Sequence, residues 1–212
     1  MPGVAHQERV ALCDLLDELG PQAPTLCDGW TTNDLAAHLV TRDTRPDAIP
    51  GLLIPGAPER RTHRLEAQTK RAVPYGELVR RIRSGPSPLS PLGVPGLREL
   101  VNIHEYFVHH EDVRRANGAG PRAVDERRER ALWRRLRAIA PLLLRRVQGI
   151  GVELERSGDG IITGLAGSPV VHLRGTASEL FLYLFNRKAV ADVEVSGDPD
   201  AAVQLVETRL GI

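Results

Sequence analysis

Two residues with metal-binding side chains stand four positions apart in a long predicted helix. Glu105 and His109 have the spacing that brings two side chains onto one face of an α-helix. From that face a carboxylate and an imidazole can bind one metal ion, and a catalytic zinc site takes three protein ligands and leaves a fourth position open. His38 is the predicted third ligand, because Leu35 and Leu39 require its helix to bury the same face.

Spacing alone does not distinguish this pair from others in the chain. Glu59 and His63 are also four apart, but they lie in a charged stretch that is typical of a solvated helix face, whereas apolar residues flank Glu105 and His109. From the residues alone two interpretations therefore stand. The histidines are either metal ligands or hydrogen-bonded core residues, with Glu105 then paired with an arginine.

Several polar neighbours of these residues have two interpretations each. Asn102 and Asp112 lie three residues from a predicted ligand, where they either hold that ligand in place or form a solvated face or an arginine pair. Asp34, four residues before His38, either holds the second ring nitrogen of that histidine or complements the N-terminus of the helix. The two other histidines of the Glu105 helix, at positions 104 and 110, point away from the ligand face and are excluded.

The two cysteines and the overall charge exclude several classes of protein. Cys13 and Cys27 form neither a disulfide framework nor a CxxC pair, which predicts free thiols and a cytoplasmic location. Cys27 is either a nucleophile or a small buried residue in a turn. A net charge of +1 argues against non-specific nucleic-acid binding, and no run reaches the roughly 18 apolar residues of a membrane span. Nucleophile-elbow, phosphate-loop and dinucleotide-binding motifs are missing from the sequence.

The hydrophobic pattern changes its period near residue 149. Before this point the apolar residues recur at helical spacing, and after it they alternate as in strands. Helices are predicted at about 4–19, 31–43, 59–71, 77–83, 97–116 and 125–148, then strands at 152–155, 161–163, 169–173 and 193–195 with helices at 176–185 and 200–210. We therefore expect a helical domain over residues 1–149 and a small α/β domain over residues 150–212.

Two segments carry a resemblance to a known family. The segments TLCDGWTTNDLAAHLV (25–40) and NIHEYFVHHEDVRR (102–115) resemble the actinobacterial branch of the DinB-like metalloproteins, which includes mycothiol-dependent maleylpyruvate isomerase. The resemblance implies an N-terminal four-helix bundle that holds a divalent metal through His38, Glu105 and His109. Zinc is the expected metal, although nickel, cobalt, manganese and iron accept similar ligands. It also implies pairing as a homodimer.

The second half of the chain extends the resemblance. Residues 170–187, VVHLRGTASELFLYLFNR, resemble the small α/β domain of sterol carrier proteins that follows the bundle in this family. The resemblance implies an α plus α/β architecture, and it assigns a catalytic arginine at Arg187. The alternative for Arg187 is a cationic side chain that complements the C-terminal end of a helix.

The expected function follows from the resemblance and from the predicted ligands. The leading hypothesis is a metal-dependent enzyme that uses a low-molecular-weight thiol, namely mycothiol, for thiol transfer, thiol addition or cis–trans isomerisation of a small unsaturated acid. An open metal position would favour the thiolate form of the bound thiol, and Arg187 would hold the substrate carboxylate. The alternatives are a metal-dependent hydrolase and a non-catalytic protein that binds a metal or another ligand.

Overall fold

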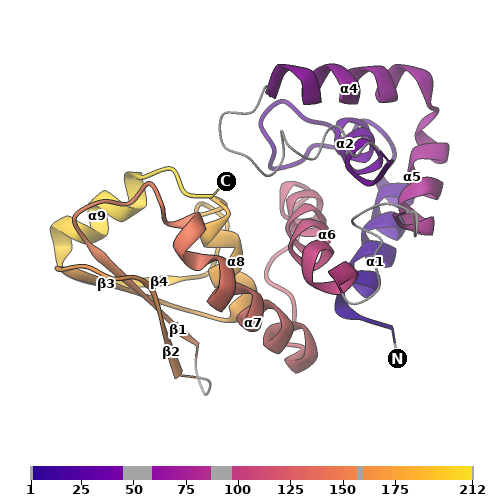
Figure 1. Ribbon diagram of the computed structural model, residues 1–212. Helices are drawn as coiled ribbons and strands as arrows, with labels where there is room; N and C mark the ends of the chain where they lie inside the picture. Colours follow the sequence, from indigo (N-terminus) through magenta and orange to yellow (C-terminus); the bar gives the residue numbers. More distant parts are fainter. Residues whose placement is uncertain (1, 45–58, 87–96, 157–159, 212) are drawn as a thin grey trace. The chain divides into compact units, whose positions relative to one another are not determined.

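The computed structural model describes residues 2–44, 59–86, 97–156 and 160–211, with the side chains of residues 59–61, 97, 98, 100 and 101 outside the description. The chain divides into two compact units, residues 1–120 and 121–212 (Figure 1). Across the described ranges, no helix combines the length and the apolar character that crossing a membrane requires.

The first unit is built from helices in its described part. Helix α1 packs along α6 and α5, and α2 packs against α4 and α5. Leucines at helical spacing and two aromatic residues of α6 are fully buried and form the core between these helices. The helices are α1 (Val4–Leu19), α2 (Thr32–Thr44), α4 (Glu59–Ala72), α5 (Tyr75–Ser84) and α6 (Leu97–Ala116). The helical character is as predicted, and the finer expectation of a four-helix bundle stays a prediction.

The start of α2 is fixed by a carboxylate within its first turn. Both the backbone N–H and the hydroxyl of Thr31 donate to Asp34 Oδ2, at 3.0 and 2.7 Å. The other oxygen of Asp34 accepts from Lys70 Nζ on α4 at 2.5 Å. Asp34 therefore complements the helix N-terminus, which was the second of its two interpretations, and it ties α2 to α4.

The second unit combines a four-stranded mixed sheet with three helices in the described residues. The strand order is β2-β1-β3-β4, with β1 and β3 parallel at the centre and antiparallel strands at both edges. Val152 and Leu154 of β1 pair with Val171 and Leu173 of β3, and all four are fully buried. The elements are α7 (Glu126–Leu143), β1 (Gly151–Arg156), β2 (Gly160–Leu165), β3 (Val170–Arg174), α8 (Ala177–Leu184), β4 (Glu194–Gly197) and α9 (Pro199–Glu207).

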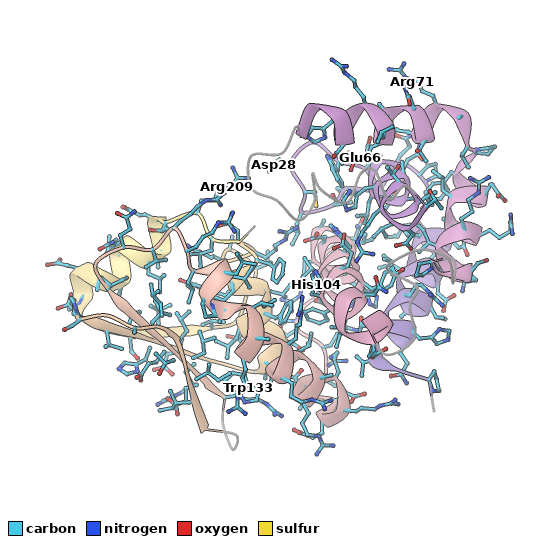
Figure 2. All side chains as sticks on the ribbon, in the orientation of Figure 1. Asp28, Glu66, Arg71, His104, Trp133 and Arg209 are labelled. Carbon is cyan, nitrogen blue, oxygen red and sulfur yellow. The ribbon has the colours of Figure 1, made fainter. Side chains whose placement is uncertain are left out.

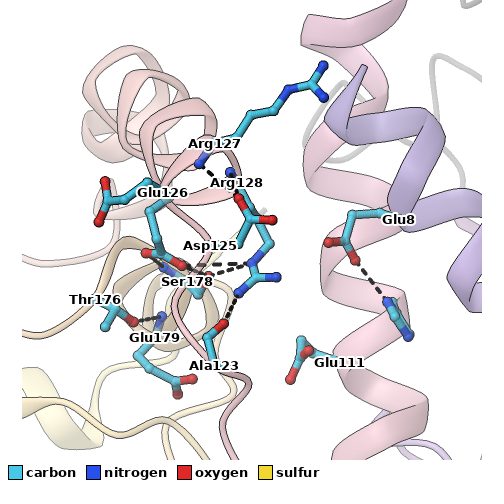
Figure 3. A network of polar contacts seen from close by, with 12 residues as sticks. Glu8, Glu111, Ala123, Asp125, Glu126, Arg127, Arg128, Thr176, Ser178 and Glu179 are labelled. Atoms are coloured by element: carbon cyan, nitrogen blue, oxygen red, sulfur yellow. Dashed lines mark hydrogen bonds and ion pairs between the residues drawn. The ribbon is translucent and has the colours of Figure 1, made fainter. Parts of the chain in front are cut away.

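Carboxylates and a hydroxyl satisfy the first N–H groups of α7 and α8 (Figure 3). Asp125 accepts from two backbone N–H groups of the first turn of α7. Thr176 accepts from the backbone N–H of Glu179 at 3.3 Å, as a cap at the start of α8. The buried Glu129 of α7 accepts from the N–H of Ser178 at 3.0 Å, so α7 itself supplies a partner for the N-terminus of α8.

The division between the two units lies earlier than the boundary that was predicted near residue 149. Helix α7 belongs to the second unit, because it packs on α8 and β2. Its apolar side, with Leu132, Leu136 and Leu143, is fully buried. A helical period shows that a helix has one face to bury, but it does not show which neighbour covers that face.

Candidate metal centre

The structure brings together the three residues that were predicted as ligands. His38 comes from α2, and Glu105 and His109 come from successive turns of α6. The Nε2 atoms of His38 and His109 lie 3.0 and 3.3 Å from the same oxygen, Glu105 Oε1. In a tetrahedral zinc site with bonds of about 2.0–2.1 Å, the donor atoms are about 3.3 Å apart. The three side chains therefore suit a zinc ion in donor type, and the two histidine–carboxylate distances are close to that spacing.

The second nitrogen of each histidine is held by another carboxylate. Glu66 Oε1 of α4 lies 2.7 Å from Nδ1 of His38, and Asp112 Oδ2 lies 3.0 Å from Nδ1 of His109. Figure 2 shows Glu66 on the side of α4 that is turned toward α2. With both Nδ1 atoms occupied, both rings turn Nε2 toward Glu105. Asp112 therefore holds a predicted ligand in place, which was the first of its two interpretations. The role of Glu66 was not foreseen from the sequence.

A buried arginine holds the second oxygen of Glu105. Arg42 Nε lies 3.5 Å from Glu105 Oε2, and Arg42 Nη1 donates to Asp43 Oδ1 and to Asn102 Oδ1, each at 2.9 Å. The hydroxyl of Tyr106 donates to the other oxygen of Asp43 at 2.9 Å. Asn102 therefore pairs with an arginine, which was its second interpretation. The network fixes Glu105 with Oε1 facing the histidines.

The electrostatics of the site favour positive charge between the carboxylates. Burial raises the pKa of Glu105, but Arg42 and the two histidines lower it more, so the pKa lies well below its usual value. Burial opposes charge on His38 and His109, yet the hydrogen bonds that their rings donate to the surrounding carboxylates outweigh it and raise both pKa values. Cys27 adds to the shift at His109. Positive charge is thus stabilised where a cation would bind.

Three other histidines of the first unit take other positions. His110 Nδ1 lies 2.8 Å from Glu8 Oε2 of α1, in a buried pair (Figure 3). His104 Nε2 is 3.9 Å from Glu105 Oε2 and belongs to neither group of potential metal-binding side chains among the described residues. His63 is 65% exposed and lies 3.3 Å from Glu66 Oε2, as expected for a solvated helix face.

Cys27 lies closer to the site than its sequence position suggested. Its Sγ is 3.3 Å from Asp112 Oδ2, the oxygen that also contacts His109 Nδ1. Cys27, His109 and Asp112 form a second group of potential metal ligands, which shares His109 with the first. Cys27 is partly exposed, whereas Asp112 is completely buried.

The two cysteines should differ sharply in reactivity. Cys13 is fully buried, and burial raises the pKa of its thiol to about 12, so almost no thiolate forms at pH 8. We expect iodoacetamide to alkylate Cys27 in the native protein while less than about a tenth of Cys13 reacts. Intact-mass measurement with peptide mapping checks this result. Cys27→Ser should abolish the added mass and Cys13→Ser should keep it; equal labelling of both cysteines would contradict the burial of Cys13.

Arg187 lies in the second unit, directly after α8. Asn186 takes a left-handed conformation (φ 65°) and ends the helix, and the Arg187 N–H donates to the carbonyl of Leu182 at 2.9 Å. The Arg187 side chain donates through Nη1 to the carbonyl of Phe185 at 2.6 Å. This contact is the one expected of a charge at a helix C-terminus, and the catalytic role of Arg187 stays a prediction.

Comparison with known proteins identifies a likeness of fold. No protein-family model matches the chain, and no curated protein matches it in sequence. Two crystal structures match, each with 17% sequence identity, 91% of this chain covered and 90% of the other. They are mycothiol-dependent maleylpyruvate isomerase, with a TM-score of 0.60, and a mutant of it in which a histidine is replaced by alanine, with a TM-score of 0.62. The predicted resemblance is confirmed at the level of the fold.

Proposed function

We propose that this protein is a metal-dependent enzyme that uses a low-molecular-weight thiol, with mycothiol as the expected one. The reaction is the addition or transfer of the thiol, or the cis–trans isomerisation of a small unsaturated acid that the thiol assists. The cytoplasmic location and the homodimer that were expected from the sequence remain predictions alongside it.

One observation carries the proposal. Two imidazole nitrogens from different helices converge on a single carboxylate oxygen, and the opposite nitrogen of each ring is held by a further carboxylate. Core histidines need only a hydrogen-bond partner for each nitrogen, whereas this convergence also provides three ligand atoms at the spacing of a metal site. The fold shared with an isomerase that depends on mycothiol supports a thiol as cosubstrate.

Some residues of the site would hold the metal, and others orient the residues that hold it. His38, Glu105 and His109 would hold the metal, and zinc is the expected ion because two imidazoles and one carboxylate suit it. Arg42 keeps Glu105 Oε1 directed toward the two rings, and Asp112 keeps His109 Nε2 free for ligation. A bound divalent metal supplies positive charge that favours the thiolate, which is the nucleophilic form of a thiol, at neutral pH.

The isomerisation requires no oxidant or reductant. The thiolate sulfur adds to one carbon of the C=C bond, and the π electron pair moves into the conjugated carbonyl group. The former double bond can then rotate as a single bond. Expulsion of the thiolate restores the double bond in the trans form and regenerates the nucleophile. Arg187 is our candidate for the group that holds the substrate carboxylate, through charge-assisted hydrogen bonds from its guanidinium.

The proposal is tested by turnover of maleylpyruvate and related cis-unsaturated acids with mycothiol, in protein as purified, after chelator treatment, and after zinc is restored. We expect turnover that needs both the thiol and the metal, with activity lost on chelation and recovered with zinc. Full turnover in metal-depleted protein would overturn the mechanism. Turnover that does not depend on added thiol would indicate the alternative of a metal-dependent hydrolase. No turnover with any acceptor would indicate a non-catalytic binding protein.

A further inference from the structure

We infer that Glu66 is a positioning residue of the metal site, which acts by holding Nδ1 of His38 so that Nε2 is the ligand. This inference deepens the proposed function and rests on it. Glu66 binds no metal itself in this assignment. Its role is to fix the tautomer and the ring orientation of a ligand that comes from a different helix.

The contact between Glu66 and His38 is short and shielded from solvent. Glu66 Oε1 lies 2.7 Å from His38 Nδ1, and the two side chains are 13% and 9% exposed. Glu66 occupies the face of α4 that also carries Thr62 and Leu65, both buried, and Thr69. This face packs on α2. The carboxylate is therefore presented to His38 by the packing of two helices.

A carboxylate at Nδ1 determines what the other nitrogen can do. A neutral imidazole carries one N–H, and the nitrogen that bears it cannot bind a metal. When Nδ1–H donates to Glu66, the lone pair is on Nε2, which is the atom that faces Glu105 Oε1. The negative charge of the partner also makes the imidazole a stronger ligand, and loss of such a partner typically lowers metal affinity by about 10–100-fold.

Glu66 and Asp112 do the same task by different structural means. Asp112 lies one helical turn after His109, so α6 alone sets that pair. Glu66 reaches His38 only while α4 is docked on α2, and that docking has two further polar links. The hydroxyl of Thr41 donates to Thr69 at 2.8 Å, and Lys70 pairs with Asp34. These links permit variants that weaken the docking without removing the carboxylate.

The experiment measures zinc affinity by competition with a chromophoric chelator in the full chain. We expect Glu66→Ala to bind zinc about 10–100-fold more weakly than wild-type protein. Glu66→Gln should lose less, because the amide oxygen can still accept the Nδ1–H bond. Thr69→Val removes a neighbouring α2–α4 hydrogen bond, and His63→Ala removes the exposed partner of the same carboxylate; both should stay within about twofold of wild type.

A second readout separates positioning from general stability. In zinc-loaded, ¹⁵N-labelled protein, long-range ¹H–¹⁵N correlation spectra report which nitrogen of each ring is protonated. Wild-type protein should show a slowly exchanging Nδ1–H for His38 and for His109, and Glu66→Ala should lose only the signal of His38. The signal of His109 is the internal reference, because Asp112 remains in place.

The outcomes are distinguishable. In one outcome wild-type protein binds zinc, and Glu66→Ala keeps the same zinc affinity and the same His38 signal. This outcome overturns the inference and leaves the proposed function intact. Equal losses of affinity in Glu66→Ala and Thr69→Val overturn it too, since helix docking alone would then explain the effect. Failure of wild-type protein to bind zinc overturns the proposed function together with the role of Glu66.

Discussion

Zinc content should fall from about one ion per chain in wild-type protein to less than about a tenth of that in His38→Ala and in His109→Ala. Each substitution leaves two of the three ligands, and the two that remain cannot enclose a cation at the observed spacing. Elemental analysis of untagged protein, purified without chelator and then dialysed with zinc, measures the effect. No substitution outside the three ligands is expected to change metal content as much.

The matched control for this measurement is His63→Ala. His63 follows an acidic residue at the same spacing as His109, and it contacts Glu66, yet it is 65% exposed and outside the donor group. Its replacement should leave the zinc content unchanged. Zinc missing from every sample, including wild type after reconstitution, would return both histidines to a role in the core. A loss of zinc in Cys27→Ser alone would instead indicate that the metal is held by the donor group of Cys27, His109 and Asp112.

The bounds of two long helices could be predicted closely from the spacing of their apolar residues. The periodicity predicted helices at 4–19 and 97–116, and α1 and α6 have these bounds. The assignment of α7 could not be made in the same way, since its leucines fit a helical bundle as well as they fit the cover of a sheet. Partner choice depends on shape and packing between elements that are distant in the sequence, which no single segment encodes.

The candidate site shows the same limit at the level of single residues. His38, Glu105 and His109 could be selected because apolar neighbours predict burial of their faces. Glu66 could not, because α4 is rich in charged residues and its period offers only Leu65 as a buried aliphatic anchor. The one available signal was the row of Thr62, Leu65 and Thr69 at spacings of three and four, which places residue 66 on the packed side.

Loss of the Arg42 guanidinium should lower the free energy of unfolding of metal-free protein by about 3–5 kcal/mol. Arg42 is 6% exposed and lies between the carboxylates of Asp43 and Glu105. Arg42→Met keeps most of the side-chain volume, but it leaves the buried Asp43 without its cation and removes the arginine from Glu105. Urea unfolding followed by circular dichroism measures the loss. The control is Arg80→Met, which removes an ion pair to Glu77 from a side chain that is 67% exposed, and it should leave the free energy of unfolding nearly unchanged.

The pH dependence of that deficit identifies its cause. Arg42 is the main group that lowers the pKa of Glu105 against the effect of burial. A carboxyl with a folded-state pKa below its unfolded value stabilises the fold above that unfolded value, and this contribution is lost as the pH falls. Arg42→Met lacks much of this contribution at pH 7, so its free energy of unfolding falls less on acidification. The difference between wild type and Arg42→Met should therefore shrink as the pH falls below the usual carboxyl value of 4.5, whereas a deficit that stays constant as the pH falls through this value would assign the loss to packing of the arginine stem.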